Sequence, residues 1–250
     1  MKTLVAVIAL AATLISGPAR AIEPDSCEVP GYLLFGDSEL KRVAAAVKDH
    51  KRLEIAVIGT ASSILPGSGV NAYPARLEAA LRARLPGITV NVTSLAKPRQ
   101  TTAEMVQTLK KVLTDLKPDL VIWQSGTIDA MRGVDLEQFR AALDRGIETI
   151  RDAGADVILM NMQYSPRTES MIAIDPYIDN MRAAAREREV PLFDRFAIMR
   201  NWSDTGAFDL YTATSLPAMA EKVHGCIGRA LASLIIDGAR LSPLEAKAAQ

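Results

Sequence analysis

The sequence predicts an α/β protein: a single-domain, doubly wound (flavodoxin-like) parallel sheet of about five strands. Short, almost continuously apolar runs occur at residues 53–58, 88–92, 120–123, 157–161 and 191–193. Such runs are typical of strands that helices cover on both faces. Between them, apolar residues recur at helical spacing over residues 73–84, 101–116, 135–153 and 175–189. This alternation predicts a parallel sheet whose ligands bind beyond the carboxyl ends of its strands.

The length and composition indicate one large domain. The chain has 250 residues with 49% hydrophobic content, enough for one substantial core, and no shift in composition marks a second. We expect an N-terminal arm and helix over residues 22–52, with the helix at 39–50. The main domain then covers residues 53–240, is closed by a helix at 217–236, and precedes a loose tail at 241–250.

Residues 1–21 have the features of a secretory signal peptide. Lys2 precedes an apolar run at 4–15, which Gly17-Pro18 and the small-residue triplet 19–21 follow. The apolar run is shorter than the roughly 20 residues of a spanning helix. The sequence therefore predicts transport across the inner membrane, cleavage before Ile22, and a periplasmic mature protein without a membrane span.

The chain has only two cysteines, Cys27 and Cys226. In an oxidising compartment, an isolated pair predicts one disulfide, here joining the N-terminal arm to the last helix. Two buried free thiols are the alternative.

The charge balance disfavours nucleic acid as a partner, and the absence of two kinds of motif disfavours metals and phosphate-containing cofactors. With 29 basic and 29 acidic residues the net charge is zero, so nothing favours nucleic acid. The sequence has no cluster of histidine, cysteine and carboxylate residues at metal-ligand spacing, and no glycine loop of the phosphate-binding type. We expect neither a metal nor a cofactor.

Two predicted strand ends carry segments that indicate a family. The first strand leads into residues 59–63 (GTASS), and the third leads into residues 124–129 (QSGTID). In this layout, from about residue 53 to 236, the chain resembles the SGNH/GDSL hydrolases. The resemblance implies a nucleophilic serine after the first strand, a glycine after the second and an asparagine after the third. It also implies an Asp-x-x-His block before the last helix, which supplies the base that a serine requires.

The residues at these family positions differ from the family's pattern. The direct counterparts are Ala61 for the serine, Ala96 for the glycine, Ile128 for the asparagine, and Ser215 and Ala218 for the last block. Alanine has no hydroxyl, and isoleucine cannot donate a hydrogen bond. The loss of one oxyanion donor typically lowers the rate by about 10²–10³. These substitutions predict a degenerate active site.

A literal Gly-Asp-Ser sequence also occurs at residues 36–38, but it precedes a helix instead of following a sheet strand. We expect Asp37 or Ser38 to cap that helix.

Four residues remain as weak catalytic candidates: Ser62, Ser63, Asp209 and His224. The two serines follow the first strand, where they can instead satisfy loop or helix amides. His224 falls within the predicted last helix, and we expect it to be a surface or packing residue. A divergent enzyme would need one serine hydroxyl within hydrogen-bond distance of its base.

Polar residues at the strand ends predict a cleft that holds a sugar, acyl or carboxylate group. They are Thr60, Lys97, Arg99, Gln124, Thr127, Asp129, Gln163 and Arg167. Asp129 matches an aspartate of the family, and we expect a structural role for it. The alternative is that these residues cap helices and solvate loops.

The sequence therefore favours an exported protein of SGNH-hydrolase type that acts as a non-catalytic binding or accessory protein of the cell envelope. Its partners would be a small ester or carbohydrate ligand, or an active paralogue. The alternative is a divergent serine esterase or deacetylase that acts on carbohydrate or lipid esters of the envelope.

Overall fold

The computed structural model describes residues 27–34, 38–65, 67–211 and 217–241. The expected signal peptide, the tail beyond residue 241 and Ser215 lie outside these residues.

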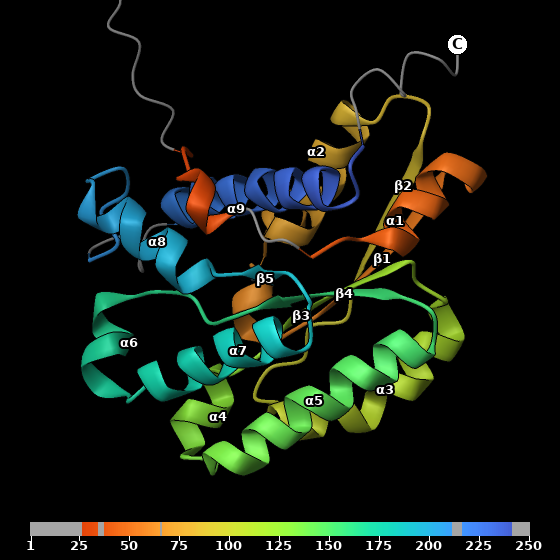
Figure 1. Ribbon diagram of the computed structural model, residues 1–250. Helices are drawn as coiled ribbons and strands as arrows, with labels where there is room; N and C mark the ends of the chain where they lie inside the picture. Colours follow the sequence, from red (N-terminus) through yellow and green to blue (C-terminus); the bar gives the residue numbers. More distant parts are fainter. Residues whose placement is uncertain (1–26, 35–37, 66, 212–216, 242–250) are drawn as a thin grey trace, which may run out of the picture.

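The centre of the fold is a five-stranded sheet with the strand order β2-β1-β3-β4-β5, and all its pairs are parallel (Figure 1). The strands are β1 (Arg52–Ile58), β2 (Thr89–Ser94), β3 (Leu120–Gln124), β4 (Asp156–Met160) and β5 (Leu192–Phe193). Every residue of β3 is buried, as its continuously apolar sequence requires. The predicted doubly wound, flavodoxin-like sheet is confirmed.

Helices cover both faces of this sheet (Figure 1). On one face lie α1 (Lys41–Ala45), α2 (Tyr73–Arg84) and α9 (Pro217–Gly238). On the other face lie α3 (Thr102–Leu116), α5 (Leu136–Asp152) and α7 (Asp175–Glu187). A π-helical turn, Ala46–His50, extends α1, and short 3-10 turns span Gly31–Leu33, Ala61–Ser63 and Gly69–Asn71.

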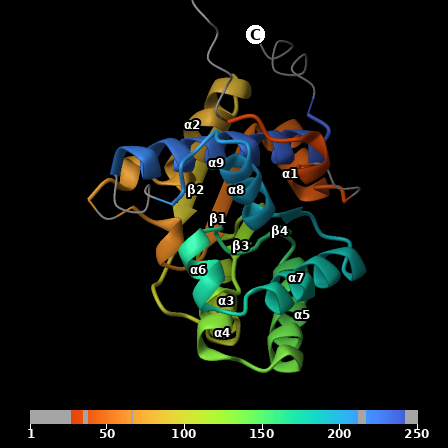
Figure 2. The ribbon, with the colours of Figure 1, turned by 90° about the vertical axis from the view of Figure 1, so that its left-hand side faces the viewer.

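Three helices were not predicted from the sequence: α4 (Thr127–Arg132), α6 (Pro166–Met171) and α8 (Arg195–Asp204). They lie together on the side of the molecule that faces the viewer in Figure 2. Helices α4 and α6 have only six residues each, too few to show a helical repeat of apolar residues. Each of the three follows the carboxyl end of a strand, so they surround the edge at which a ligand is expected.

The expected cap of α1 is wrong for Ser38, and Asp37 lies outside the described residues. Helix α1 starts after Leu40, and no side chain caps it. Leu40 is buried, and its backbone N–H donates to Gly238 O at 2.9 Å. The start of α1 is therefore fixed by packing against the end of α9.

The predicted disulfide is present between Cys27 and Cys226, which are 199 residues apart in sequence. It joins the N-terminal arm to α9. The same arm is held by a hydrogen bond from Trp202 Nε1 to Glu28 O at 2.8 Å.

Candidate ligand-binding site

The ends of β1 and β3 meet through the side chain of Gln124, the last residue of β3. Gln124 is fully buried, and its Oε1 accepts hydrogen bonds from Thr60 N (3.1 Å), Thr60 Oγ1 (3.3 Å) and Ser63 Oγ (2.8 Å). A Cβ at Gly59 would clash with Ser63 Oγ and Gln124 Oε1, so this close approach requires glycine. Gln124 and Thr60, both predicted as ligand contacts, thus bind each other.

Ser63 is held inside the same network. Its hydroxyl proton goes to Gln124 Oε1, so Tyr73 Oη, 3.0 Å away, donates to Ser63 Oγ. Burial raises the pKa of Tyr73, which keeps the phenol protonated. We expected Ser63 to satisfy a loop or helix amide, but the partners of its hydroxyl are Gln124 and Tyr73. Its hydroxyl bridges two buried side chains instead.

His224 packs against this network from α9. It is only 5% exposed, which makes it a packing residue and excludes the surface position that was the other expectation. Its Nδ1 accepts a hydrogen bond from the backbone N–H of Tyr73 at 3.0 Å. Burial, and secondly the charge of Arg195, lower the pKa of His224 to about 3.

The bond to Nδ1 determines the tautomer of His224. A neutral imidazole has one N–H and one acceptor nitrogen, and here the acceptor is Nδ1. The ring proton is therefore on Nε2. In a serine hydrolase, the histidine instead presents its unprotonated nitrogen to the serine hydroxyl. His224 has the opposite arrangement and can only donate from Nε2.

Arg195, the first residue of α8, belongs to this edge and was not predicted from the sequence, like Tyr73. It is fully buried and lies with its guanidinium 5.7 Å from the centre of the Tyr73 ring. Its Nη1 donates to Ser62 O (3.1 Å) and Ser62 Oγ (3.4 Å), and its Nη2 donates to Gln163 Oε1 (3.3 Å). Burial lowers the pKa of Arg195 to about 10, so it stays charged at neutral pH.

A cavity of about 730 Å³ lies beyond these side chains. Most of its wall is apolar and comes from Ile64, Leu65, Ile128, Met131, Met171, Ile172, Met199, Leu210, Met219 and Val223. Its polar lining includes Thr60, Ser62, Arg99, Thr127, Gln163, Arg167, Arg195 and His224. Met131 and Met171 are 60% and 72% exposed, which places them at the opening. A concave, mostly apolar site with a few polar groups is typical of a small-molecule pocket.

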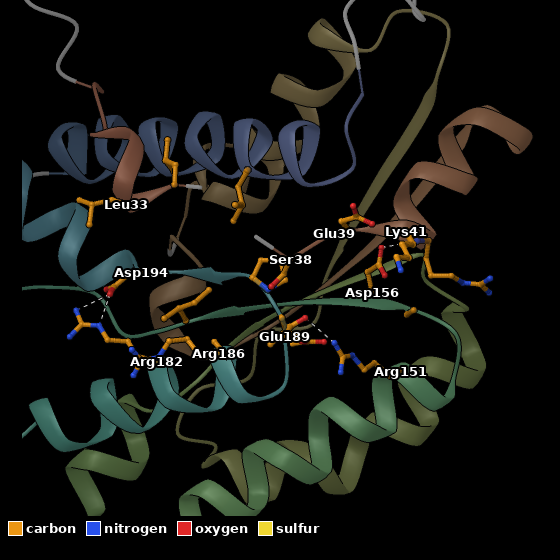
Figure 3. A pocket seen from close by; sticks show the side chains of 18 of the residues that line it. Leu33, Ser38, Glu39, Lys41, Arg151, Asp156, Arg182, Arg186, Glu189 and Asp194 are labelled. Carbon is orange, nitrogen blue, oxygen red and sulfur yellow. Dashed lines mark hydrogen bonds and ion pairs between the residues drawn. The ribbon is translucent and has the colours of Figure 1, made fainter. Parts of the chain in front are cut away.

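A larger cavity, about 1150 Å³, lies elsewhere and is shown in Figure 3. It is lined by the start of β4, by α7 and by the segment that precedes α1, including Ser38. Within it, Arg182 pairs with Asp194, and Asp156 Oδ2 accepts from the backbone N–H groups of Arg42 and Val43. It contains none of the residues that the family resemblance places at the active site.

Within the described residues, no three histidine, cysteine or carboxylate side chains are grouped in a way that could hold a metal ion. No helix in the same part of the chain has the length and apolar character to cross a bilayer.

The sequence profile of the Non-GDSL lipase-like family matches residues 26–241. The chain belongs to this family.

Solved structures show the same relationship at the level of the fold. One of Axe2, an acetylxylan esterase from Geobacillus stearothermophilus, has a TM-score of 0.59 at 18% identity and covers 76% of this chain and 95% of its own. The structure of TesA has a TM-score of 0.57 at 22% identity, covering 72% and 98%. The structure of LAE5, an alpha/beta hydrolase enzyme from the metagenome of Lake Arreo, Spain, has a TM-score of 0.57 at 20% identity, covering 75% and 95%. A search of curated proteins found no match.

These findings confirm the resemblance to SGNH/GDSL hydrolases, so each expected position of this Non-GDSL lipase-like protein can be located. Ala61 and Ile128 line the cavity beside Thr60 and Thr127. Ala96 is half-buried and Ala218 is exposed, and neither lines the cavity.

Besides Gln124 and Ser63, the predicted residues Asp129, Lys97 and Asp209 also lie outside the cavity wall. Asp129 is buried and accepts from Thr102 N (3.1 Å) and Thr102 Oγ1 (2.9 Å), so it anchors the start of α3. Burial raises the pKa of Asp129. Lys97 is exposed and is not part of the cavity wall. Asp209 is also exposed and accepts from Tyr211 N at 3.1 Å.

Proposed function

We propose that this protein binds a small apolar ligand in the cavity at the carboxyl edge of its sheet, without hydrolysing it. The observation that carries this proposal is the hydrogen bond from Tyr73 N to His224 Nδ1. Of the two histidines, His224 lies nearest to the expected active site of the family. Its Nδ1 lone pair accepts a hydrogen bond from a backbone amide. A serine at this edge then has no imidazole that can take its proton.

The remaining groups around the cavity support the same conclusion. Ala61 is at the position where the family resemblance implies a serine hydroxyl. Ile128 is at the position where it implies the amide donor of an asparagine. Ser63 Oγ is occupied by Gln124 and Tyr73. Ser62 Oγ faces the guanidinium of Arg195, which carries donors only and accepts no proton at neutral pH.

We further propose that the protein acts outside the cytoplasm, as an exported binding or accessory protein of the periplasm. The predicted signal peptide and the Cys27–Cys226 disulfide support this location. An active paralogue is a possible partner in that compartment.

A divergent serine esterase is the second candidate. Its support is that Ser62 lines the cavity and that the fold is shared with esterases. It would require a base other than His224, because the observed tautomer of His224 carries its proton on Nε2.

The binding proposal predicts saturable fluorescence enhancement of the neutral apolar probe Nile red with a stoichiometry of one. Ile128→Asp should weaken this binding more than tenfold, because it places an unpaired carboxylate in an apolar wall. The matched control is Leu116→Asp, a partly exposed leucine at the end of α3 that is not part of the cavity wall. Absence of saturable binding, or equal losses in both variants, would contradict the proposal.

A further inference from the structure

We propose that the ligand of this cavity carries a single carboxylate group and that Arg195 anchors it. The inference rests on the proposed binding function and specifies the head group of the ligand. It identifies the ligand class as amphiphiles with an apolar chain and a monoanionic carboxylate head.

The first support is a buried charge without a counter-charge. Arg195 is fully buried, and no carboxylate within the described residues forms an ion pair with it. Its contacts are the backbone carbonyl and hydroxyl of Ser62, the amide oxygen of Gln163 and the face of Tyr73. Buried charges in proteins are normally paired, because desolvation of an isolated ion is highly unfavourable.

The second support is an excess of donors at this end of the cavity. Within the described residues, only three buried side-chain atoms lack a hydrogen-bond partner: Gln124 Nε2, Thr127 Oγ1 and Arg195 Nε. All three can donate and all belong to the carboxyl edge; Thr127 and Arg195 line the cavity, and Gln124 lies behind its wall. His224 adds the N–H of its Nε2. A cluster of unused donors complements a group that only accepts, as a carboxylate does.

The third support is that a carboxylate matches the guanidinium of Arg195 in charge and in shape. A guanidinium presents five N–H donors in a planar fork that fits a carboxylate with two parallel hydrogen bonds. One carboxylate would neutralise the one buried cation, whereas a dianionic phosphate would leave a net charge against apolar walls. Arg99 and Arg167 also line the cavity, but they are exposed and remain solvated.

Calorimetric titration of the purified protein with decanoate and with decanol tests this inference, because the two ligands share a chain and differ in charge. We expect decanoate to bind more tightly than decanol. Arg195→Met, which keeps an unbranched apolar side chain and removes the charge, should weaken decanoate binding roughly 10- to 100-fold. Decanol binding should change less than about threefold, which excludes general damage to the cavity.

The outcomes separate the two proposals. If neither ligand binds the wild-type protein and Nile red also fails, the binding function itself is wrong. If decanol and decanoate bind equally well, or if Arg195→Met leaves decanoate binding unchanged, the cavity is apolar only and Arg195 is structural. Tighter binding of decyl phosphate than of decanoate would overturn the carboxylate assignment.

The wild-type protein offers a second readout that does not depend on the folding of a variant. Decanoate affinity should stay constant between pH 7 and 9 and fall below about pH 5, where a carboxylate takes up a proton. Decanol affinity should not follow this change. The groups that face Arg195 do not titrate in this window, since the pKa of Tyr73 is raised and that of His224 is about 3. Parallel pH profiles for the two ligands would overturn the inference.

Discussion

Reduction of the Cys27–Cys226 disulfide is expected to lower the free energy of unfolding by up to about 5 kcal/mol. The bridge closes a loop across a sequence separation of 199 residues, so its removal greatly increases the conformational freedom of the unfolded chain. Urea denaturation followed by circular dichroism, with and without a phosphine reductant, measures the difference.

The matched control for this experiment is Cys27→Ser, which cannot form the bridge. It should show the low stability of the reduced wild type, and the reductant should not change it further. Equal unfolding midpoints for oxidised and reduced wild type would contradict the expected contribution.

Acidification from pH 7.5 to pH 5 is expected to destabilise the protein through His224 by about 2 kcal/mol. The pKa of His224 is about 3 in the folded state, against an ordinary value of 6.5. Below pH 6.5 the unfolded state therefore binds a proton that the folded state does not. This group has no effect on stability above pH 6.5, and its penalty grows as the pH falls toward 3.

His224→Asn isolates this contribution, because the amide oxygen of asparagine can accept from Tyr73 N and does not titrate. The variant should lose about 2 kcal/mol less than the wild type over the same pH range. The comparison also cancels the buried carboxyl groups of Asp129 and Asp156, whose raised pKa values act in the opposite direction. Identical pH profiles would show that His224 is protonated in the folded protein.

The sheet could be predicted from the sequence because each strand is a short apolar run of the kind that is buried on both faces. The run at residues 120–123, for example, needs no knowledge of its neighbours to be identified as a central strand. The disulfide followed from the presence of only two cysteines. Ala61 and Ile128 could be placed beside the cavity from the sequence because each lies a few residues beyond a strand.

The polar core of the site could not be predicted in this way. The contact of Tyr73 with His224 joins α2 to α9 across 151 residues, and neither the bond nor the resulting tautomer has a signal in the local sequence. Arg195 could have been found, since it comes directly after the last strand at the expected ligand edge. It was missed because it matches no family position, and only its burial shows that it is unusual.

In this fold, several polar side chains at the carboxyl edge of the sheet are hydrogen-bonded to one another. Gln124, Ser63, Tyr73 and His224 form one continuous set of hydrogen bonds and ring contacts from the sheet to α9. Such a network stabilises the edge of the sheet. It also assigns Ser63 Oγ and His224 Nδ1 to hydrogen bonds within the protein.

Turnover of p-nitrophenyl octanoate by the purified protein, together with labelling by a fluorophosphonate probe, shows whether the cavity binds without hydrolysis. We expect no hydrolysis above the buffer rate and no label in the wild type, Ser62→Ala, Ser63→Ala or His224→Ala. Hydrolysis and labelling in the wild type that Ser62→Ala or Ser63→Ala abolishes would contradict this expectation and would identify the nucleophile.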